Sequence, residues 1–198
     1  MLLRISILFW VVWISAGTQA QSPKNKLVKI KVNDFLQISL PEEFRVMDSQ
    51  IYTRKYGAYR PPLAIYTSED GNADFGVNES VNQSLKAFTQ AKWNAQDLEI
   101  IKGIYKASIA AMHTEVSFIQ DKVETIRGRS FAVLEFVGFV KDEDKTITFN
   151  NTPVKQYSYL MYTVHDGKIL IFNFNCPAQI QNLWQETARQ IMQNIILK

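Results

Sequence analysis

The sequence predicts an α+β domain, built as a three-layer α/β/α sandwich around a mainly antiparallel sheet. Three observations support this fold class. The apolar patterns follow the order strands, helix, strands, helix. Short turns join the later strands, and such turns connect antiparallel neighbours. The last strands carry bulky apolar side chains on both faces, so we expect helices to cover both sides of the sheet.

The first part of the domain is predicted to be mostly strands. The segment "LVKIKVNDFLQISLPEEFRVMD" indicates two short strands, the second ending at Pro41. A helical turn and a loop fixed by Pro61 and Pro62 follow. The segment "LAIYTSEDGNADFGVN" then indicates a hairpin with its turn at Glu69–Asn72.

A long helix is predicted near residues 95–112. Asn94 is a favourable N-cap, and Asp97 follows it three residues later, as in a capping box. Apolar side chains recur at helical spacing on one face of this segment. They are Leu98, Ile101, Tyr105 and Met112, with Ile104 and Ile109 beside them.

Strands dominate residues 116–176. A turn at Arg127–Arg129 joins the first two, and Asp166–Gly167 between two apolar runs is a strong hairpin signal. The closing segment, Ala178 to Ile196, has the pattern of an amphipathic helix. Its predicted apolar face consists of Ile180, Leu183, Trp184, Thr187, Ile191 and Ile195.

The first twenty residues have the pattern of a secretory signal. Arg4 precedes an apolar run, Ile5–Ile14, and small residues lead to Ala20. We expect residues 1–20 to be cleaved and residues 21–198 to form a single exported domain without stable membrane insertion. The alternative is a retained membrane anchor, although the apolar run is shorter than the roughly 20 residues that a spanning helix needs.

Charge and composition exclude several function classes. Cleavage of the leader would remove one arginine and no acidic residue, which lowers the formal net charge from +3 to +2. So small a charge does not predict nucleic-acid binding. A single cysteine cannot form an internal disulfide. Because His113 and His165 have no second ligand at metal-binding spacing, we expect neither a metal nor another cofactor.

The stretch "LQISLPEEFRVM", the long helix before the later strands and the ending "YTVHDGKILIFNFNCPAQIQNLWQETARQIMQNI" together resemble the PsbP-like fold family. This family includes an extrinsic protein of photosystem II, a small nuclear Ran-binding protein and many exported bacterial proteins. The resemblance implies an α/β/α domain that acts as a binding or assembly module, not as an enzyme. It carries no active site over to this chain.

The segment "YTRKYGAYRPP" provides the first candidate binding surface, formed by Tyr52, Tyr56, Tyr59 and Arg60. Tyrosine and arginine are frequent in the hot spots of protein interfaces. We expect the partner to be an envelope or secreted protein, although the same composition could bind an anionic polymer or a sugar. The alternative is that the tyrosines cap the core while the cations stay in water.

A second candidate is a polar pocket in the sheet. Glu135 lies in an otherwise apolar strand row, and a buried carboxylate must find a donor, reach water or be protonated. Ser158, Asn173 and Asn175 form the polar end of one face of the last hairpin. If these four residues converge, they would bind a small ligand. Alternatively, each lies at a strand end or an edge, where water or a loop amide satisfies it.

Cys176 is the candidate nucleophile. It stands at a predicted helix start, which can lower the pKa of a thiol. The hairpin register, however, places it at the end of an apolar row, with His165 at the far end of the same hairpin. Because a nucleophile needs a base within reach, we interpret Cys176 as a core residue. The sequence thus favours a non-enzymatic exported binding or assembly module, then a small-ligand carrier, and least a hydrolase that uses Cys176.

Overall fold

The computed structural model describes residues 26–57, 61–80, 93–139 and 155–198. The predicted leader, residues 1–20, lies outside this part of the chain. Within the described ranges, no helix is both long enough and apolar enough to cross a membrane.

Ten strands and three α-helices lie in the described part of the chain. The strands are β1 (Leu27–Lys31), β2 (Leu36–Pro41), β3 (Arg45–Val46), β4 (Ala64–Thr67), β5 (Asp74–Ser80), β6 (Glu115–Ile126), β7 (Arg129–Phe139), β8 (Lys155–His165), β9 (Lys168–Pro177) and β10 (Ile196–Leu197). The helices are α1 (Ser49–Tyr56), α3 (Ala95–Met112) and α4 (Gln181–Gln193), the last preceded by a 3-10 turn, Ala178–Ile180.

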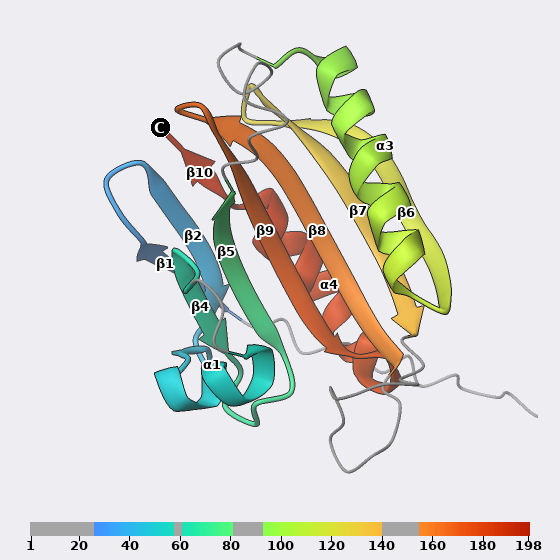
Figure 1. The fold of residues 1–198 in the computed structure, drawn as a ribbon. Helices are drawn as coiled ribbons and strands as arrows, with labels where there is room; N and C mark the ends of the chain where they lie inside the picture. Colours follow the sequence, from blue (N-terminus) through green and yellow to red (C-terminus); the bar gives the residue numbers. More distant parts are fainter. Residues whose placement is uncertain (1–25, 58–60, 81–92, 140–154) are drawn as a thin grey trace, which may run out of the picture.

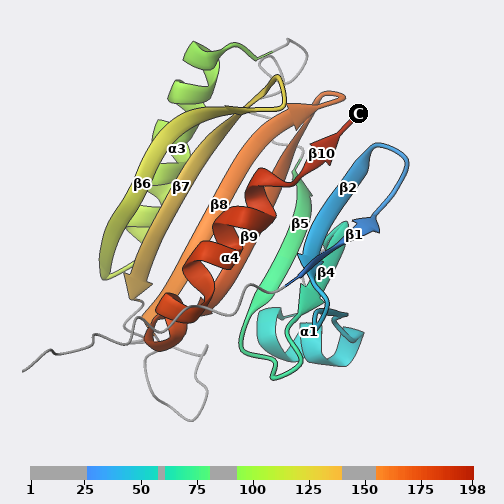
Figure 2. The ribbon, with the colours of Figure 1, turned by 180° about the vertical axis from the view of Figure 1, so that it is seen from behind.

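The strands form a large sheet in the order β3-β4-β5-β9-β8-β7-β6 and a small sheet in the order β1-β2-β10. The pairings among the described strands are antiparallel. α3 lies on one face of the large sheet, over β6 and β7 (Figure 1). α4 and the small sheet lie on the other face (Figure 2). The predicted α+β class and its three layers are therefore confirmed.

Two apolar cores hold the layers together. The larger core lies between the large sheet, α4 and β2, and it includes Ile38, Phe172 and Trp184. The smaller core lies under α3 and includes Leu98 and Tyr162. Burial of one large apolar side chain contributes about 1.5–3 kcal/mol. Core packing is thus the main stabilising interaction in a domain whose one cysteine is free.

α3 begins and ends where the sequence predicts, but Met112 and Ile104 of its predicted apolar face are 64% and 46% exposed. The Asn94 side chain accepts a hydrogen bond from the backbone N–H of Asp97 at 2.9 Å, and the Asp97 carboxylate accepts one from the N–H of Asn94 at 3.0 Å. This reciprocal capping box satisfies two backbone donors that the first turn of a helix leaves unpaired. A local sequence signal is therefore sufficient to fix the start of α3.

The closing helix is shorter than predicted. α4 ends at Gln193, and Ile196 and Leu197 form β10, which pairs with the edge of β2 that β1 leaves open. Leu183 is 51% exposed and does not belong to the buried face, contrary to prediction. The core side of α4 consists of Trp184, Thr187, Ala188, Ile191 and Met192.

Candidate functional site

α1 is a surface helix beside β4 and β5 (Figure 1). The Asp48 side chain caps its start by accepting the backbone N–H of Gln50 at 2.8 Å. Gly57 ends it at φ 77°, a conformation that favours glycine. None of its eight residues is buried. Because so short a helix is marginal on its own, α1 needs anchors to the sheet.

Asp74, the first residue of β5, provides the anchor for α1. Its carboxylate accepts hydrogen bonds from Lys55 Nζ at 2.9 and 3.1 Å and from the Tyr56 hydroxyl at 2.6 Å. Lys55 also donates to the carbonyl of Gly71 at 2.7 Å. Burial, and next the negative charge of Asp74, raise the pKa of Tyr56 above its usual value. Tyr56 therefore stays protonated and donates to a carboxylate that is only 6% exposed.

A row of polar side chains continues from Asp74 across the sheet. The register places Asp74 beside Asn175, and Asn175 beside Ser158. The Ser158 hydroxyl donates to Asn175 Oδ1 at 2.8 Å. Because alternate side chains of a strand point to the same face, residues two positions along extend this group. We call Asp74, Asn78, Ser158, Asn173 and Asn175 the polar face.

Asn78 and Asn173 form the part of the polar face that lies over Gly76. Asn78 Nδ2 donates to Asn173 Oδ1 at 3.2 Å. A Cβ atom on Gly76 would lie only 2.7 Å from that same oxygen, so the missing side chain makes room for the amide of Asn173. Asn173 and Asn175 remain half-buried. The polar face is on the α3 side of the sheet, but α3 packs over β6 and β7 and not over β5 and β9.

Glu135 lies on the opposite face of the sheet, under α4. It is fully buried and pairs with Tyr159, whereas Ser158 pairs with the next residue of β7. Glu135 therefore does not converge with Ser158, Asn173 and Asn175 as the pocket hypothesis required. The predicted group divides into two, because one step along a strand moves a side chain to the other face.

The carboxylate of Glu135 has a complete set of donors. Arg189 of α4 donates from Nη2 to both carboxylate oxygens at 3.0 and 3.1 Å and from Nε at 3.2 Å. Gln120, Tyr157 and Gln185 donate at 2.5, 3.1 and 2.6 Å. This arrangement joins β6, β7, β8 and α4, and we assign Glu135 a structural role.

The surface candidate is only partly described. The Tyr52 and Tyr56 rings lie 5.6 Å apart and are tilted by 35°. Tyr59 and Arg60 lie outside the described residues. The hydroxyl of Tyr56 is bonded to Asp74, so this tyrosine both anchors α1 and adjoins the polar face. The two candidate sites of the sequence, the tyrosine segment and the asparagines, therefore meet at Asp74.

Cys176 lies in the larger core, 2% exposed. Burial raises the pKa of its thiol to about 12, so almost none is ionised near neutral pH. His165 pairs with Lys168 at the start of β9. Lys168 precedes Cys176 by eight residues, which is about 26 Å along the strand. His113 lies on the α3 side, with Nδ1 2.8 Å from the carbonyl of Ile109. Neither histidine is placed to act as a base for Cys176.

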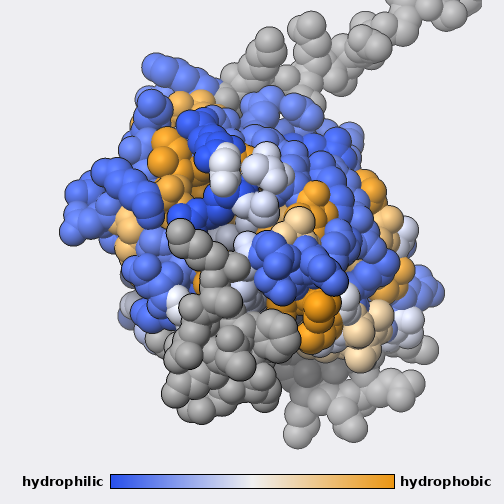
Figure 3. All heavy atoms as spheres, turned by 90° about the horizontal axis from the view of Figure 1, so that it is seen from above, coloured by the Kyte–Doolittle hydropathy of each residue, from blue (hydrophilic) through white to orange (hydrophobic). Residues whose placement is uncertain are grey.

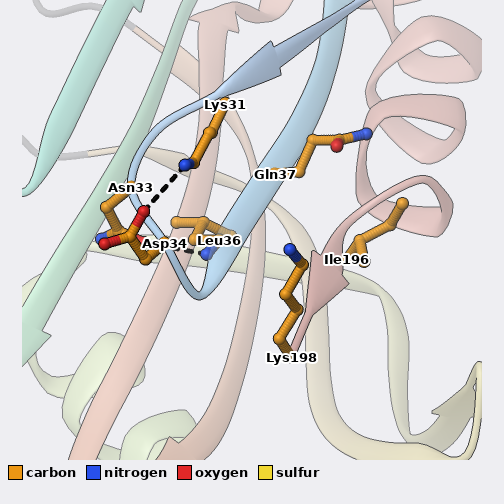
Figure 4. A pocket seen from close by; sticks show the side chains of 7 residues that line it. All are labelled: Lys31, Asn33, Asp34, Leu36, Gln37, Ile196 and Lys198. Atoms are coloured by element: carbon orange, nitrogen blue, oxygen red, sulfur yellow. Dashed lines mark hydrogen bonds and ion pairs between the residues drawn. The ribbon is translucent and has the colours of Figure 1, made fainter.

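A shallow hollow lies where the β1–β2 turn meets β10 (Figure 4). Three of its polar side chains, Lys31, Asn33 and Asp34, make contacts within the turn itself. Asn33 Oδ1 accepts the backbone N–H groups of Phe35 and Leu36 at 3.1 and 2.8 Å, and Lys31 pairs with Asp34 at 2.7 Å. In the described part of the chain, no three His, Cys, Asp or Glu side chains come together to hold a metal ion.

Sequence reasoning missed Lys55, Asp74, Gly76 and Asn78 as members of the site. Asp74 stands between Ala73 and Phe75 at the start of an apolar strand, where a charged residue must have a partner. A charged residue in this apolar stretch could have identified Asp74 as a candidate site residue. Its partners could not be found, because Lys55 lies nineteen positions earlier on another element and Asn175 pairs through a distant strand.

No protein-family model matches the chain, and no curated protein sequence matches it. Among solved structures, the cyanobacterial PsbP of a Synechocystis species has 13% identity and a TM-score of 0.54, with 92% of this chain and 99% of that chain covered. LpqN of Mycobacterium tuberculosis, described as involved in cell envelope biogenesis, has 10% identity and a TM-score of 0.49, with 87% and 91% covered. The Ran-binding protein Mog1p of Saccharomyces cerevisiae has 7% identity and a TM-score of 0.49, with 87% and 95% covered. The match to cyanobacterial PsbP extends over nearly the whole of both chains, and the chain has the PsbP-like fold.

Proposed function

We propose that the protein is an exported, non-enzymatic binding or assembly module of the cell envelope, which contacts a partner protein through α1 and the polar face. One observation carries this proposal. A helix with no buried residue is fixed to the sheet by Lys55 and Tyr56 on the buried carboxylate of Asp74, directly beside half-exposed asparagines. The PsbP-like fold and the leader pattern of the sequence are consistent with such a role.

The chemistry of this surface suits a protein partner. Arg54 is exposed on α1, and Tyr52 is half-buried next to Tyr56. Arginine and tyrosine give large contact areas with polar ends. The amides of Asn173 and Asn175 offer both donors and acceptors, which match the backbone groups of a polypeptide. A fixed backbone beneath these side chains lowers the entropy that binding costs.

The test is crosslinking of the tagged protein in the envelope of its source cell, followed by identification of the captured protein. The contact variant is Arg54→Glu, which reverses an exposed cation of α1 and leaves the hydrogen bonds of the polar face in place. The control is Lys29→Glu on β1, an exposed cation of the small sheet, which lies on the other face of the large sheet. We expect one dominant partner, lost in the contact variant and retained in the control, with equal urea midpoints for all three proteins.

A change at Tyr56 is unsuitable for this test because its hydroxyl is bonded to Asp74, so the change would loosen α1 as well as alter the surface. Failure to capture any specific partner would overturn the proposal. Equal loss of the partner in the contact variant and the control would do the same, since it would show that the contact does not depend on this surface.

A small-ligand carrier is the second candidate. The observation in its favour is the group of amide and hydroxyl side chains over Gly76, where the absent side chain gives Asn173 its position. Glu135 takes no part in this version, because it is buried on the other face. Native mass spectrometry of the protein from its source cell would show a bound small molecule that Asn173→Ala releases. A spectrum of the unliganded mass alone would exclude this candidate.

A further inference from the structure

The outer side of α3 is apolar, although a helix that covers a sheet normally exposes polar residues there. Ile100 and Ile104 are 49% and 46% exposed. The other residues of this side are small and exposed. The outer stripe, as we name it, consists of Ile100, Gly103, Ile104, Ala107 and Ala111. On the face that Figure 3 shows, the described surface is mainly hydrophilic, with hydrophobic residues in separate patches.

Gly103 has no role within the chain that the structure reveals. A Cβ atom on it would meet nothing within 4 Å. Glycine inside a helix is less favourable than residues with side chains, so Gly103 lowers the stability of α3. Together with Ala107, it lets another helix approach closely. Small residues at this spacing allow close helix–helix contacts, as they do between membrane helices.

Charged residues beside the stripe indicate what the second helix is. Glu99 and Lys106 are two turns apart on the same flank of α3, with side chains 53% and 41% exposed. If two copies of α3 pack antiparallel over their full length, residue 99 of one lies level with residue 108 of the other. Glu99 then lies within about 3 Å, along the axis, of the level of Lys106 of the second copy. Two-fold symmetry forms this pair twice.

We propose that the protein forms a symmetric dimer in which the outer stripe of α3 packs antiparallel against that of a second copy, flanked by two Glu99–Lys106 pairs. The in-chain partners of these residues, Lys102 for Glu99 and Asp121 for Lys106, remain beside the new contact. α3 is about 27 Å long, so its stripe buries less area than the roughly 1,200 Å² of stable interfaces. The dimer is therefore weak and depends on concentration.

The test is sedimentation equilibrium of the purified protein between about 10 μM and 1 mM, the range in which so small an interface associates. The decisive variant is Gly103→Gln. We expect it to raise the thermal midpoint, because glutamine favours a helix more than glycine does, and to weaken the dimer at least tenfold, because its side chain separates the helices. These opposite effects distinguish loss of the interface from damage to the fold.

Charge reversal tests the antiparallel pairing. Glu99→Lys and Lys106→Glu should each dissociate the dimer, because like charges then meet across the axis. An equimolar mixture of the two should dimerise, because every cross-pair is again complementary. Leu183→Lys, at an exposed leucine of α4, is the control and should leave association unchanged.

A wild-type protein that is monomeric up to the highest concentration would overturn the proposal. The partner of the outer stripe would then be a different protein. A dimer that Gly103→Gln does not weaken would overturn it too. If each charge variant dissociates but their mixture does not associate, the antiparallel arrangement is wrong.

Discussion

Glu135 is the most demanding residue of the fold, because it is a carboxylate with no exposed surface. A buried charge is tolerated only where donors replace its lost water. Here the guanidinium of Arg189 binds it in a bidentate manner, and three neutral side chains supply further hydrogen bonds. The side chain of Arg189 is itself 36% exposed, so solvent screens part of the attraction.

Glu135 is fully buried whereas Arg189 is partly exposed, so loss of the arginine should cost the fold a buried, unpaired charge. Arg189→Met keeps much of the apolar stem but leaves Glu135 without its cation, and we expect a loss of about 2–4 kcal/mol in the free energy of unfolding. The double variant Glu135→Gln with Arg189→Met should be more stable than Arg189→Met alone, because no unpaired charge remains inside. Urea denaturation measures both. A double variant no more stable than the single would contradict this account of the carboxylate.

At the scale of elements, Asp74 is the main anchor of α1. Lys55 and Tyr56 both bond to its carboxylate, and Lys55 also donates to the carbonyl of Gly71. We predict that Asp74→Ala releases α1 from the sheet and lowers the free energy of unfolding by about 1–3 kcal/mol. Asp74→Asn should have a smaller effect, since its amide oxygen still accepts a hydrogen bond from Tyr56.

Hydrogen exchange followed by mass spectrometry distinguishes this local release from general unfolding. In Asp74→Ala, amides of residues 49–56 should exchange much faster than in the wild type, while those of α3 keep their protection. If α1 stays protected in the alanine variant, contacts other than the Asp74 anchors fix it. If α3 loses protection equally, the change has weakened the whole domain.

The same elements show what local sequence determines. The start of α3 was predicted because its capping box is contained within four residues. The pairing of β8 with β9 was predicted because the Asp166–Gly167 turn sets the register from its own position. By contrast, β5 lies beside β9, about a hundred residues later, and no local signal records that neighbour.

The candidate site was predicted in part for the same reason. Ser158, Asn173 and Asn175 were placed correctly on one face, since a single hairpin relates them. Glu135 belongs to β7, and a long connection separates β7 from β8, so the register between these strands could not be derived. Asp74, which joins the two candidate sites, depends on three elements that only the folded chain brings together.

At the scale of the whole molecule, the sheet separates two cores that are rich in buried phenols. Burial is the largest cause that raises the pKa of Tyr157, Tyr159 and Tyr162 above their usual value. Burial also raises the pKa of the Cys176 thiol from 9.0 to about 12. Unfolding returns all four groups to water, where they ionise at their ordinary pKa values.

These shifts predict the alkaline stability of the domain. Below about pH 9 both states keep these protons, so the groups add no pH dependence. Above it the unfolded chain loses protons that the folded chain retains, so stability falls as pH rises, first through Cys176 and above about pH 10 through the phenols. Each group contributes a slope of up to about 1.4 kcal/mol per pH unit.

Urea midpoints measured from about pH 7 to pH 11 should be level and then fall. Cys176→Ala should delay the onset by about one pH unit, the difference between the ordinary pKa values of the thiol, 9.0, and the phenols, 10.0. A midpoint that stays constant to pH 11 would mean that these groups reach water in the folded protein, which would contradict the two closed cores.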